Sequence, residues 1–141
     1  MSTRQSFVLC VEDDPDTQEM LRIFIQERGC HFTAVDNCED ALRLIKETEL
    51  SLVLMDNLLP DGNGIELCRT VRKFDKDLPV VFLSGSGHDE RDRAMEVGAN
   101  AFLTKPFALD ELFAVLSDYI RLSELQLENS PASLSPNFNA S

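Results

Sequence analysis

Short apolar runs alternate with segments of helical periodicity along this chain, and this alternation limits the folds that it can adopt. The five apolar runs comprise residues 7–11, 30–35, 50–55, 78–83 and 101–103. Strands that alternate with helices in this way are typical of βαβ units, which build a parallel sheet. The first, third and fourth runs are almost entirely apolar, as expected of central strands covered by helices on both faces. The second and fifth runs are less apolar, so we expect them nearer the sheet edges.

Helix signals separate these runs. Asp14 precedes Pro15, so an acidic cap and an early helical proline predict a helix that starts there and stops at Gly29. A second helix is predicted to start near Asn37. Apolar residues at helical spacing identify the faces that these helices bury. In chain order they are Met20, Leu21, Phe24 and Ile25; Ala41, Leu42 and Ile45; Ile65, Cys68 and Val71; Ala94 and Val97; and Leu109, Leu112, Phe113, Leu116 and Ile120.

The segment after the third run contains two pairs of residues that are typical of tight β-hairpins, Asp61-Gly62 and Asn63-Gly64. The residues that follow have helical rather than alternating periodicity. We therefore expect this segment to be a loop that leads into the third helix, and not a hairpin.

Charged residues stand where the buried strands are predicted to end. Glu12, Asp13 and Asp14 follow the first run, Asp56 follows the third, and Lys105 comes shortly after the fifth. In an open parallel sheet the carboxyl ends of the strands line one crevice, so these charges should meet there. Carboxylates that crowd together repel one another, so a positive charge is needed among them. A divalent cation with oxygen ligands, supplemented by the Lys105 ammonium, meets this need.

The cluster predicts phosphoryl chemistry as well as metal binding. Mg²⁺ keeps several of its waters, so Asp13 and Asp56 suffice to hold it. A carboxylate at such a metal can also act as a nucleophile toward phosphorus and form an aspartyl-phosphate. Lys105 would then share the charge on the phosphoryl oxygens. Ser84 directly follows the fourth run and precedes Gly85, and from this position its hydroxyl can reach a phosphoryl oxygen.

Composition argues against several other classes of function. With 25 acidic and 13 basic residues, the formal net charge is −12, so direct nucleic-acid binding is not expected. The four cysteines form no C-x-x-C pair and the two histidines do not lie at zinc-finger spacing, so we expect reduced thiols in a cytoplasmic protein. The first residues carry no secretory signal, and no apolar run approaches the length of a membrane span.

Three motifs together resemble the receiver domains of two-component response regulators. They are Val11-Glu12-Asp13-Asp14-Pro15, Asp56 with Leu59-Pro60-Asp61-Gly62 and Gly64, and Lys105-Pro106-Phe107. The resemblance covers about residues 6–121 and implies a flavodoxin-like (βα)5 fold, a doubly wound parallel sheet of five strands in the order 2-1-3-4-5. We expect the receiver over residues 1–121. Residues 122–141 would form a helix extension and then a flexible tail, or a linker to an output domain.

The resemblance also implies roles for individual residues. Asp56 would be the phosphoacceptor and Asp13 a direct ligand of Mg²⁺. Glu12 would act largely through metal-bound water, and the Leu58 carbonyl would be a further ligand. The phosphoryl group would come from a sensor histidine kinase or a histidine phosphotransfer protein.

Ser84 and Phe102 resemble the switch pair of the family. In that family the hydroxyl turns toward the phosphoryl group while the ring turns inward, which remodels the face formed by the fourth helix, fifth strand and fifth helix. An output domain, a partner protein or a second copy of the chain would bind that face. Ser84 replaces the more usual threonine, and Phe102 replaces the common tyrosine and so lacks a phenolic group.

The resemblance includes two positions that set the lifetime of the phosphoryl group. They are Leu58 and Ser86, and both side chains provide little to orient an attacking water molecule. We therefore hypothesise a phosphorylated state that lives longer than that of fast chemotaxis receivers.

Other classes of function fit the residues less well. A magnesium-dependent aspartyl-phosphate phosphohydrolase would need a general acid two residues after Asp56, where Leu58 stands. A phosphate-binding flavodoxin would need a first loop that attracts phosphate, but this loop is acidic. A pseudo-receiver, which binds partners without phosphorylation, would not need Asp13, Asp56, Ser84 and Lys105. The expected protein is therefore not an enzyme with a free substrate, and it catalyses only its own phosphorylation and dephosphorylation.

Overall fold

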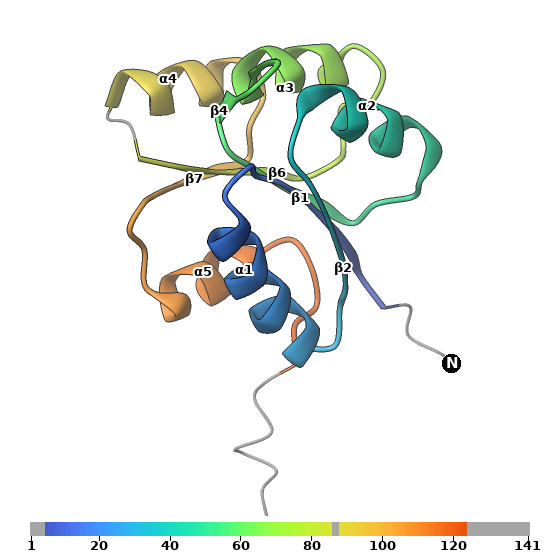
Figure 1. Ribbon diagram of the computed structural model, residues 1–141, viewed down its shortest axis with the longest axis vertical. Coiled ribbons are helices and arrows are strands. Elements are labelled where there is room, and N and C mark those ends of the chain that lie inside the picture. The colour runs from blue at the N-terminus through green and yellow to red at the C-terminus, as the bar shows by residue number, and fades with distance from the viewer. Residues whose placement is uncertain (1–4, 86–87, 124–141) are drawn as a thin grey trace, which may run out of the picture.

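A computed structural model describes residues 5–85 and 88–123 as an α/β fold around a five-stranded parallel sheet (Figure 1). Its strands are β1 (Phe7–Val11), β2 (His31–Val35), β3 (Leu52–Met55), β6 (Val80–Ser84) and β7 (Ala101–Thr104). They lie in the order β2-β1-β3-β6-β7, which is 2-1-3-4-5 when only these strands are counted. The predicted flavodoxin-like topology is confirmed, and the two less apolar runs form the edge strands as expected.

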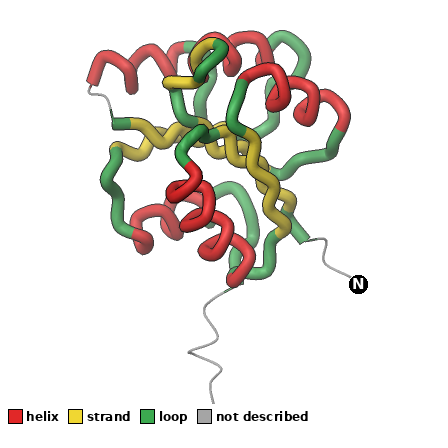
Figure 2. The backbone as a smooth tube through the Cα atoms, in the orientation of Figure 1, coloured by secondary structure: helices red, strands yellow, loops and turns green. Residues whose placement is uncertain are grey.

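Helices cover both faces of the sheet (Figures 1 and 2). Helices α1 (Pro15–Glu27) and α5 (Leu109–Leu116) lie on one face, and α2 (Cys38–Glu47), α3 (Gly64–Arg72) and α4 (His88–Glu96) lie on the other. None of the helices in the described part of the chain is long and apolar enough to span a membrane.

Each central strand contributes to two apolar cores because successive side chains point to opposite faces of a sheet. In β1, Val8 and Cys10 pack with the side chains of α1 and α5. Leu9 and Val11 belong to the second core, which α2, α3 and α4 complete. All four side chains are almost fully buried. This packing fixes the position of β1 between the two layers of helices, and with it the position of the charged residues that follow the strand.

One expectation about the chain after β3 was wrong. Residues 58–63 form a short antiparallel hairpin, in which β4 (Leu58–Leu59) pairs with β5 (Gly62–Asn63), and α3 follows directly. Asp61 in its turn accepts hydrogen bonds from the first N–H groups of α2, and these bonds anchor the hairpin to that helix. Asn63 then caps α3 by accepting a hydrogen bond from the N–H of Glu66 at 2.8 Å.

The last helix is also shorter than expected. Helix α5 ends at Leu116, so it does not continue through Ile120 and into residues 121–123. The backbone N–H groups that follow donate to carbonyls only three residues back, Asp118 to Val115 at 3.2 Å and Tyr119 to Leu116 at 2.9 Å, so the chain tightens into a turn. Ile120 is nevertheless buried, as the periodicity indicated. The remainder of the expected extension, residues 124–141, lies outside the described part of the chain.

Candidate functional site

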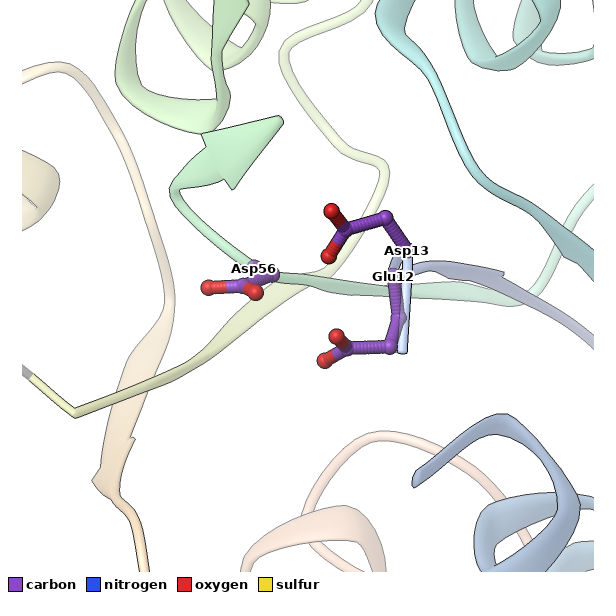
Figure 3. Close-up of side chains that lie close together, drawn as sticks. All are labelled: Glu12, Asp13 and Asp56. Carbon is purple, nitrogen blue, oxygen red and sulfur yellow. The ribbon is translucent and has the colours of Figure 1, made fainter. Parts of the chain in front are cut away.

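Three carboxylates meet at the carboxyl ends of two neighbouring strands (Figure 3). Glu12 and Asp13 follow β1, and Asp56 follows β3. The last residues of these strands are register partners, so the residues after them emerge side by side. One oxygen from each of the three carboxylates lies within 4.8 Å of the other two. The structure thus brings together three of the four acidic residues that the sequence placed in one crevice. The fourth, Asp14, instead caps α1, because its carboxylate accepts a hydrogen bond from the Thr17 N–H at 3.0 Å.

Glu12 is the most deeply placed of these carboxylates, with an exposed fraction of 2 %. Its Oε1 accepts a hydrogen bond from Lys105 Nζ at 2.7 Å, and its Oε2 accepts one from the Asp14 N–H at 3.0 Å. Burial raises the pKa of Glu12 above its ordinary value, and these two donors act in the opposite direction. The charged form of Glu12 therefore depends on positive charge nearby.

Lys105 supplies positive charge between two of the carboxylates. It follows β7, and its Nζ lies 2.7 Å from Glu12 Oε1 and 3.6 Å from Asp56 Oδ2. Burial opposes the ammonium charge, but the ion pairs with Glu12 and Asp56 outweigh it and raise the pKa of Lys105. Lys105 is therefore a fixed cation at neutral pH, placed beside Asp56.

Ser84 and Phe102 lie on adjacent strands, β6 and β7. Ser84 is buried, and its hydroxyl donates to Glu90 Oε1 on α4. Phe102 is half-buried, and its ring stacks on that of Phe82 with the centroids 6.2 Å apart. The hydroxyl of the expected switch residue is therefore engaged by helix α4.

The two positions expected to set the phosphoryl lifetime are Leu58 and Ser86. Leu58 lies in the hairpin after Asp56, and 68 % of its surface is exposed. Its apolar side chain offers no hydrogen bond to a water molecule. Ser86 lies outside the described residues.

Sequence reasoning did not identify Asn57, although it lies next to Asp56. Asn57 is 5 % exposed, and its backbone N–H donates to Asp56 Oδ1 at 2.7 Å. Its side-chain oxygen accepts from the N–H of Ile65 at 3.0 Å, and its side-chain nitrogen donates to Glu90 at 2.5 Å. Asn57 therefore orients the Asp56 carboxylate and links it to α3 and α4. A polar residue inside the apolar stretch around Asp56 was the only signal in the sequence.

The donor set suits a hard divalent cation. The three clustered ligand atoms are carboxylate oxygens, which Mg²⁺ prefers. The nearby thiol of Cys10 is buried, and burial raises its pKa above the ordinary value. The thiol therefore stays protonated and is a poor metal ligand. The residues present therefore fit Mg²⁺ better than zinc.

The fold and the site are those of a receiver domain, and the chain belongs to the response regulator receiver domain family, whose model matches residues 8–117. It is the receiver domain of a two-component response regulator. The chain is 33 % identical over 128 residues to the transcriptional regulatory protein GltR of Pseudomonas aeruginosa, covering 88 % of this chain and 52 % of GltR. It thus spans about half the length of that regulator.

Two further relatives are covered almost completely. An uncharacterized 14.6 kDa protein of Leptolyngbya boryana is 34 % identical over 118 residues, which cover 82 % of this chain and 90 % of that protein. The non-phosphorylated HemR receiver domain of Leptospira biflexa is 35 % identical and has a TM-score of 0.77, with 85 % of this chain and 98 % of that chain covered. The family match over residues 8–117 spans all five helices and nearly the whole sheet.

Asp61 is a second residue that sequence reasoning gave no structural role of its own. Its carboxylate accepts from the N–H groups of Cys38 at 2.7 Å and Glu39 at 3.1 Å, across 23 and 22 residues of chain. These bonds, chiefly that from Cys38, hold the pKa of Asp61 below its ordinary value of 3.8. Asp61 thereby fastens the hairpin after Asp56 to the start of α2.

We predict that Asp61→Asn will destabilise the protein in a pH-dependent way. A depressed pKa stabilises the folded state above the ordinary pKa, and this contribution disappears as the pH falls through the folded-state pKa. The variant should therefore have a lower urea midpoint than the wild type at pH 7, and the difference should shrink below about pH 4. The exposed residue Asp92 provides the control Asp92→Asn. Equal midpoints for Asp61→Asn and wild type at pH 7 would contradict the capping role.

Proposed function

We propose that Asp56 accepts a phosphoryl group from a phosphohistidine of a partner protein, in a reaction that needs Mg²⁺. The partner would be a sensor histidine kinase or a histidine phosphotransfer protein. The observation that carries this proposal is the position of Lys105, whose Nζ lies 3.6 Å from Asp56 Oδ2 beside two further carboxylates. A nucleophile, metal ligands and a fixed cation are the parts that phosphoryl transfer to a carboxylate requires.

In the proposed reaction a carboxylate oxygen of Asp56 forms a bond to phosphorus. The phosphorus–nitrogen bond of the phosphohistidine breaks, and the imidazole nitrogen keeps the electron pair. The Asn57 N–H, 2.7 Å from Asp56 Oδ1, orients the carboxylate, and Lys105 neutralises charge on the incoming group. Glu12, Asp13, Asp56 and the Leu58 carbonyl would hold Mg²⁺, which when bound offsets negative charge on the phosphoryl oxygens.

An apolar groove beside the site supports docking of a protein donor. A cavity of about 380 Å³ is lined by Thr17, Met20, Lys105, Pro106 and Phe107, and so shares Lys105 with the acidic cluster. Met20 and its neighbour on α1, Ile23, are 37 % and 49 % exposed. Apolar side chains at this position would bury against a partner that presents its phosphohistidine to Asp56.

Ser84 and Phe102 are the proposed switch pair. Phosphorylation would draw the Ser84 hydroxyl to a phosphoryl oxygen and change the packing of Phe102, and so alter the face formed by α4, β7 and α5. An output domain, a partner protein or a second copy of the chain would bind that face. Residues 1–121 would form the receiver, and residues 122–141 an extension, tail or linker.

Intact mass spectrometry after incubation with Mg²⁺ and acetyl phosphate tests the proposed function. We expect an adduct of one phosphoryl group that EDTA and Asp56→Asn each abolish and that Asp92→Asn leaves unchanged. If the wild type gains no adduct, or the adduct survives in Asp56→Asn, Asp56 is not the phosphoacceptor. The first result would favour a pseudo-receiver. Steady release of phosphate over many turnovers would instead favour a phosphohydrolase.

We predict that the phosphorylated protein will persist for many minutes after the donor is removed. Leu58 is exposed and apolar, so it cannot orient a water molecule for attack on the phosphoryl group. Leu58→Asn, which introduces an amide at this position, should shorten the half-life by roughly tenfold or more. The decay of the phosphoryl adduct after rapid desalting measures both half-lives. A wild-type half-life of seconds would contradict the prediction.

A further inference from the structure

Helix α4 carries a buried carboxylate to which the proposed chemistry gives no role. Glu90 lies in the first turn of α4 and is 4 % exposed. Its Oε1 accepts a hydrogen bond from the Ser84 hydroxyl, and its Oε2 accepts one from the Asn57 side chain at 2.5 Å. Both oxygens are thus satisfied by neutral donors that belong to the phosphoacceptor region. Removal of such a donor leaves a buried carboxylate oxygen without a hydrogen bond, which destabilises the folded protein.

These bonds carry much of the attachment of α4 to the sheet. Among the side chains described in α4, those of residues 89–96, only Glu90 and Ala94 are buried. Ala94 presents a single methyl group to the second core. A helix with so little buried apolar surface is held mainly by its polar contacts. A change at Glu90 can therefore shift the helix at a small cost in free energy.

The Ser84 hydroxyl has one proton and can donate it to only one acceptor at a time. We propose that Glu90 is a positioning residue that holds this hydroxyl in the unphosphorylated protein, and that phosphorylation releases the first turn of α4 by drawing the hydroxyl away. This inference rests on the proposed phosphorylation of Asp56. When the hydroxyl turns to a phosphoryl oxygen, Glu90 Oε1 loses its donor. The carboxylate then moves toward solvent and displaces the start of α4.

Asn57 provides a second connection between Asp56 and Glu90. Its backbone N–H bonds to Asp56, and its side chain bonds to Glu90. A change in the position of the Asp56 carboxylate is therefore transmitted to Glu90 through a single residue. The two donors of Glu90 both depend on the state of Asp56, so α4 responds to one local event.

The affinity for beryllofluoride in Mg²⁺, a mimic of the phosphoryl group, tests the competition for the Ser84 proton. Glu90→Gln replaces a charged acceptor with a neutral and weaker one, so the hydroxyl becomes easier to withdraw and binding should tighten about fivefold. Glu96→Gln makes the same change at an exposed position of the same helix and should leave the affinity unchanged. Amide chemical shifts in a titration monitored by NMR report the binding.

A double-mutant cycle separates this competition from the simple loss of a negative charge. In a Ser84→Ala background there is no hydroxyl to withdraw, so Glu90→Gln should no longer tighten binding. The same gain in both backgrounds, or no gain in the wild-type background, would overturn the proposal. A wild type that fails to bind beryllofluoride would instead contradict the proposed function.

Hydrogen exchange provides a second measurement, which does not require Glu90→Gln to fold. In the unphosphorylated protein, Ser84→Ala removes the donor of Glu90 Oε1, so amides of residues 88–96 should exchange about tenfold faster. Amides of α1, on the opposite face of the sheet, serve as the internal reference. Unchanged exchange in α4 would show that Ser84 does not hold this helix, and the proposal would fail.

Discussion

Lys105→Met is expected to reduce the initial rate of Asp56 phosphorylation by about 100-fold to 1000-fold, as the loss of one fixed charge from a preorganised site commonly does. The ammonium lies 3.6 Å from Asp56 Oδ2 and 2.7 Å from Glu12 Oε1, so without it the three clustered carboxylates face the incoming phosphoryl group with their charge no longer offset by this ion pair. The rate is measured as the appearance of the phosphoryl adduct with acetyl phosphate at saturating Mg²⁺.

Two controls separate this effect from a loss of folding. Lys76→Met makes the same change at an exposed residue away from the site and should keep the wild-type rate. Because Lys105→Met leaves a buried carboxylate without its ion pair, circular dichroism must show that the variant is folded at the assay temperature. A folded variant that is phosphorylated at the wild-type rate would rule out the proposed role of Lys105.

The sheet was predictable because its strands are encoded locally. Three nearly continuous apolar runs identified the strands now seen at the centre, β1, β3 and β6, and two mixed runs identified the edges. The convergence of Glu12, Asp56 and Lys105 followed from the same step, since parallel strands end at one side of a sheet. The order of the strands came from the resemblance to receiver domains rather than from the spacing of the runs.

The contacts around the site were not predictable in the same way. Asp61 bonds to residues 22 and 23 positions away, and Asn57 bonds to Glu90 across 33 positions. Apart from the apolar neighbours of Asn57, nothing in the local sequence distinguishes these polar residues from solvated ones, because the packing of α2, α3 and α4 determines which partners they meet. Their roles became visible only once the helices were placed against the sheet.

Local sequence patterns also gave wrong predictions where one pattern is typical of two different structures. The residues Asp61 to Gly64 fit both a hairpin and a helix start, and the structure contains both in succession. In α1, helical spacing included Met20 in the buried face, but Met20 is 37 % exposed because Leu21, Phe24 and Ile25 already fill the space against the sheet. Periodicity locates a buried face to within about one residue in each turn.

The hairpin and the acidic cluster meet at Gly64, the first residue of α3. Its backbone N–H donates to the Asn57 carbonyl at 2.8 Å, so the start of the helix lies close to the loop after β3 that holds Asp56. A side chain at this position would have a Cβ only 2.4 Å from the Asp56 carbonyl oxygen, 2.9 Å from Met55 and 3.0 Å from Phe82. The short approach of α3 to β3 thus requires glycine for reasons of space.

We therefore predict that Gly64→Ala will destabilise the protein by about 3 kcal/mol. The closest atom is backbone, which cannot rotate away as the end of a side chain does, so either α3 or the chain at Asp56 must move. A displacement of Asp56 by about 1 Å should also slow its phosphorylation about 100-fold in the fraction that remains folded. Urea unfolding followed by circular dichroism measures the first effect, and intact mass with acetyl phosphate measures the second.

Gly85→Ala is the matched control for stability, because among the described residues, its chain neighbours aside, a Cβ at Gly85 would meet no heavy atom within 4 Å. The same substitution there should change the free energy of unfolding by no more than about 0.5 kcal/mol. If both alanine variants unfold at the wild-type urea midpoint, the space beside Asp56 is not closed and α3 does not approach β3 as described. A third outcome is that Gly64→Ala alone loses stability and yet keeps the wild-type phosphorylation rate. In that case α3 moves to accommodate the new methyl group while Asp56 stays in place, so the rigid part of the site is the strands and not the helix.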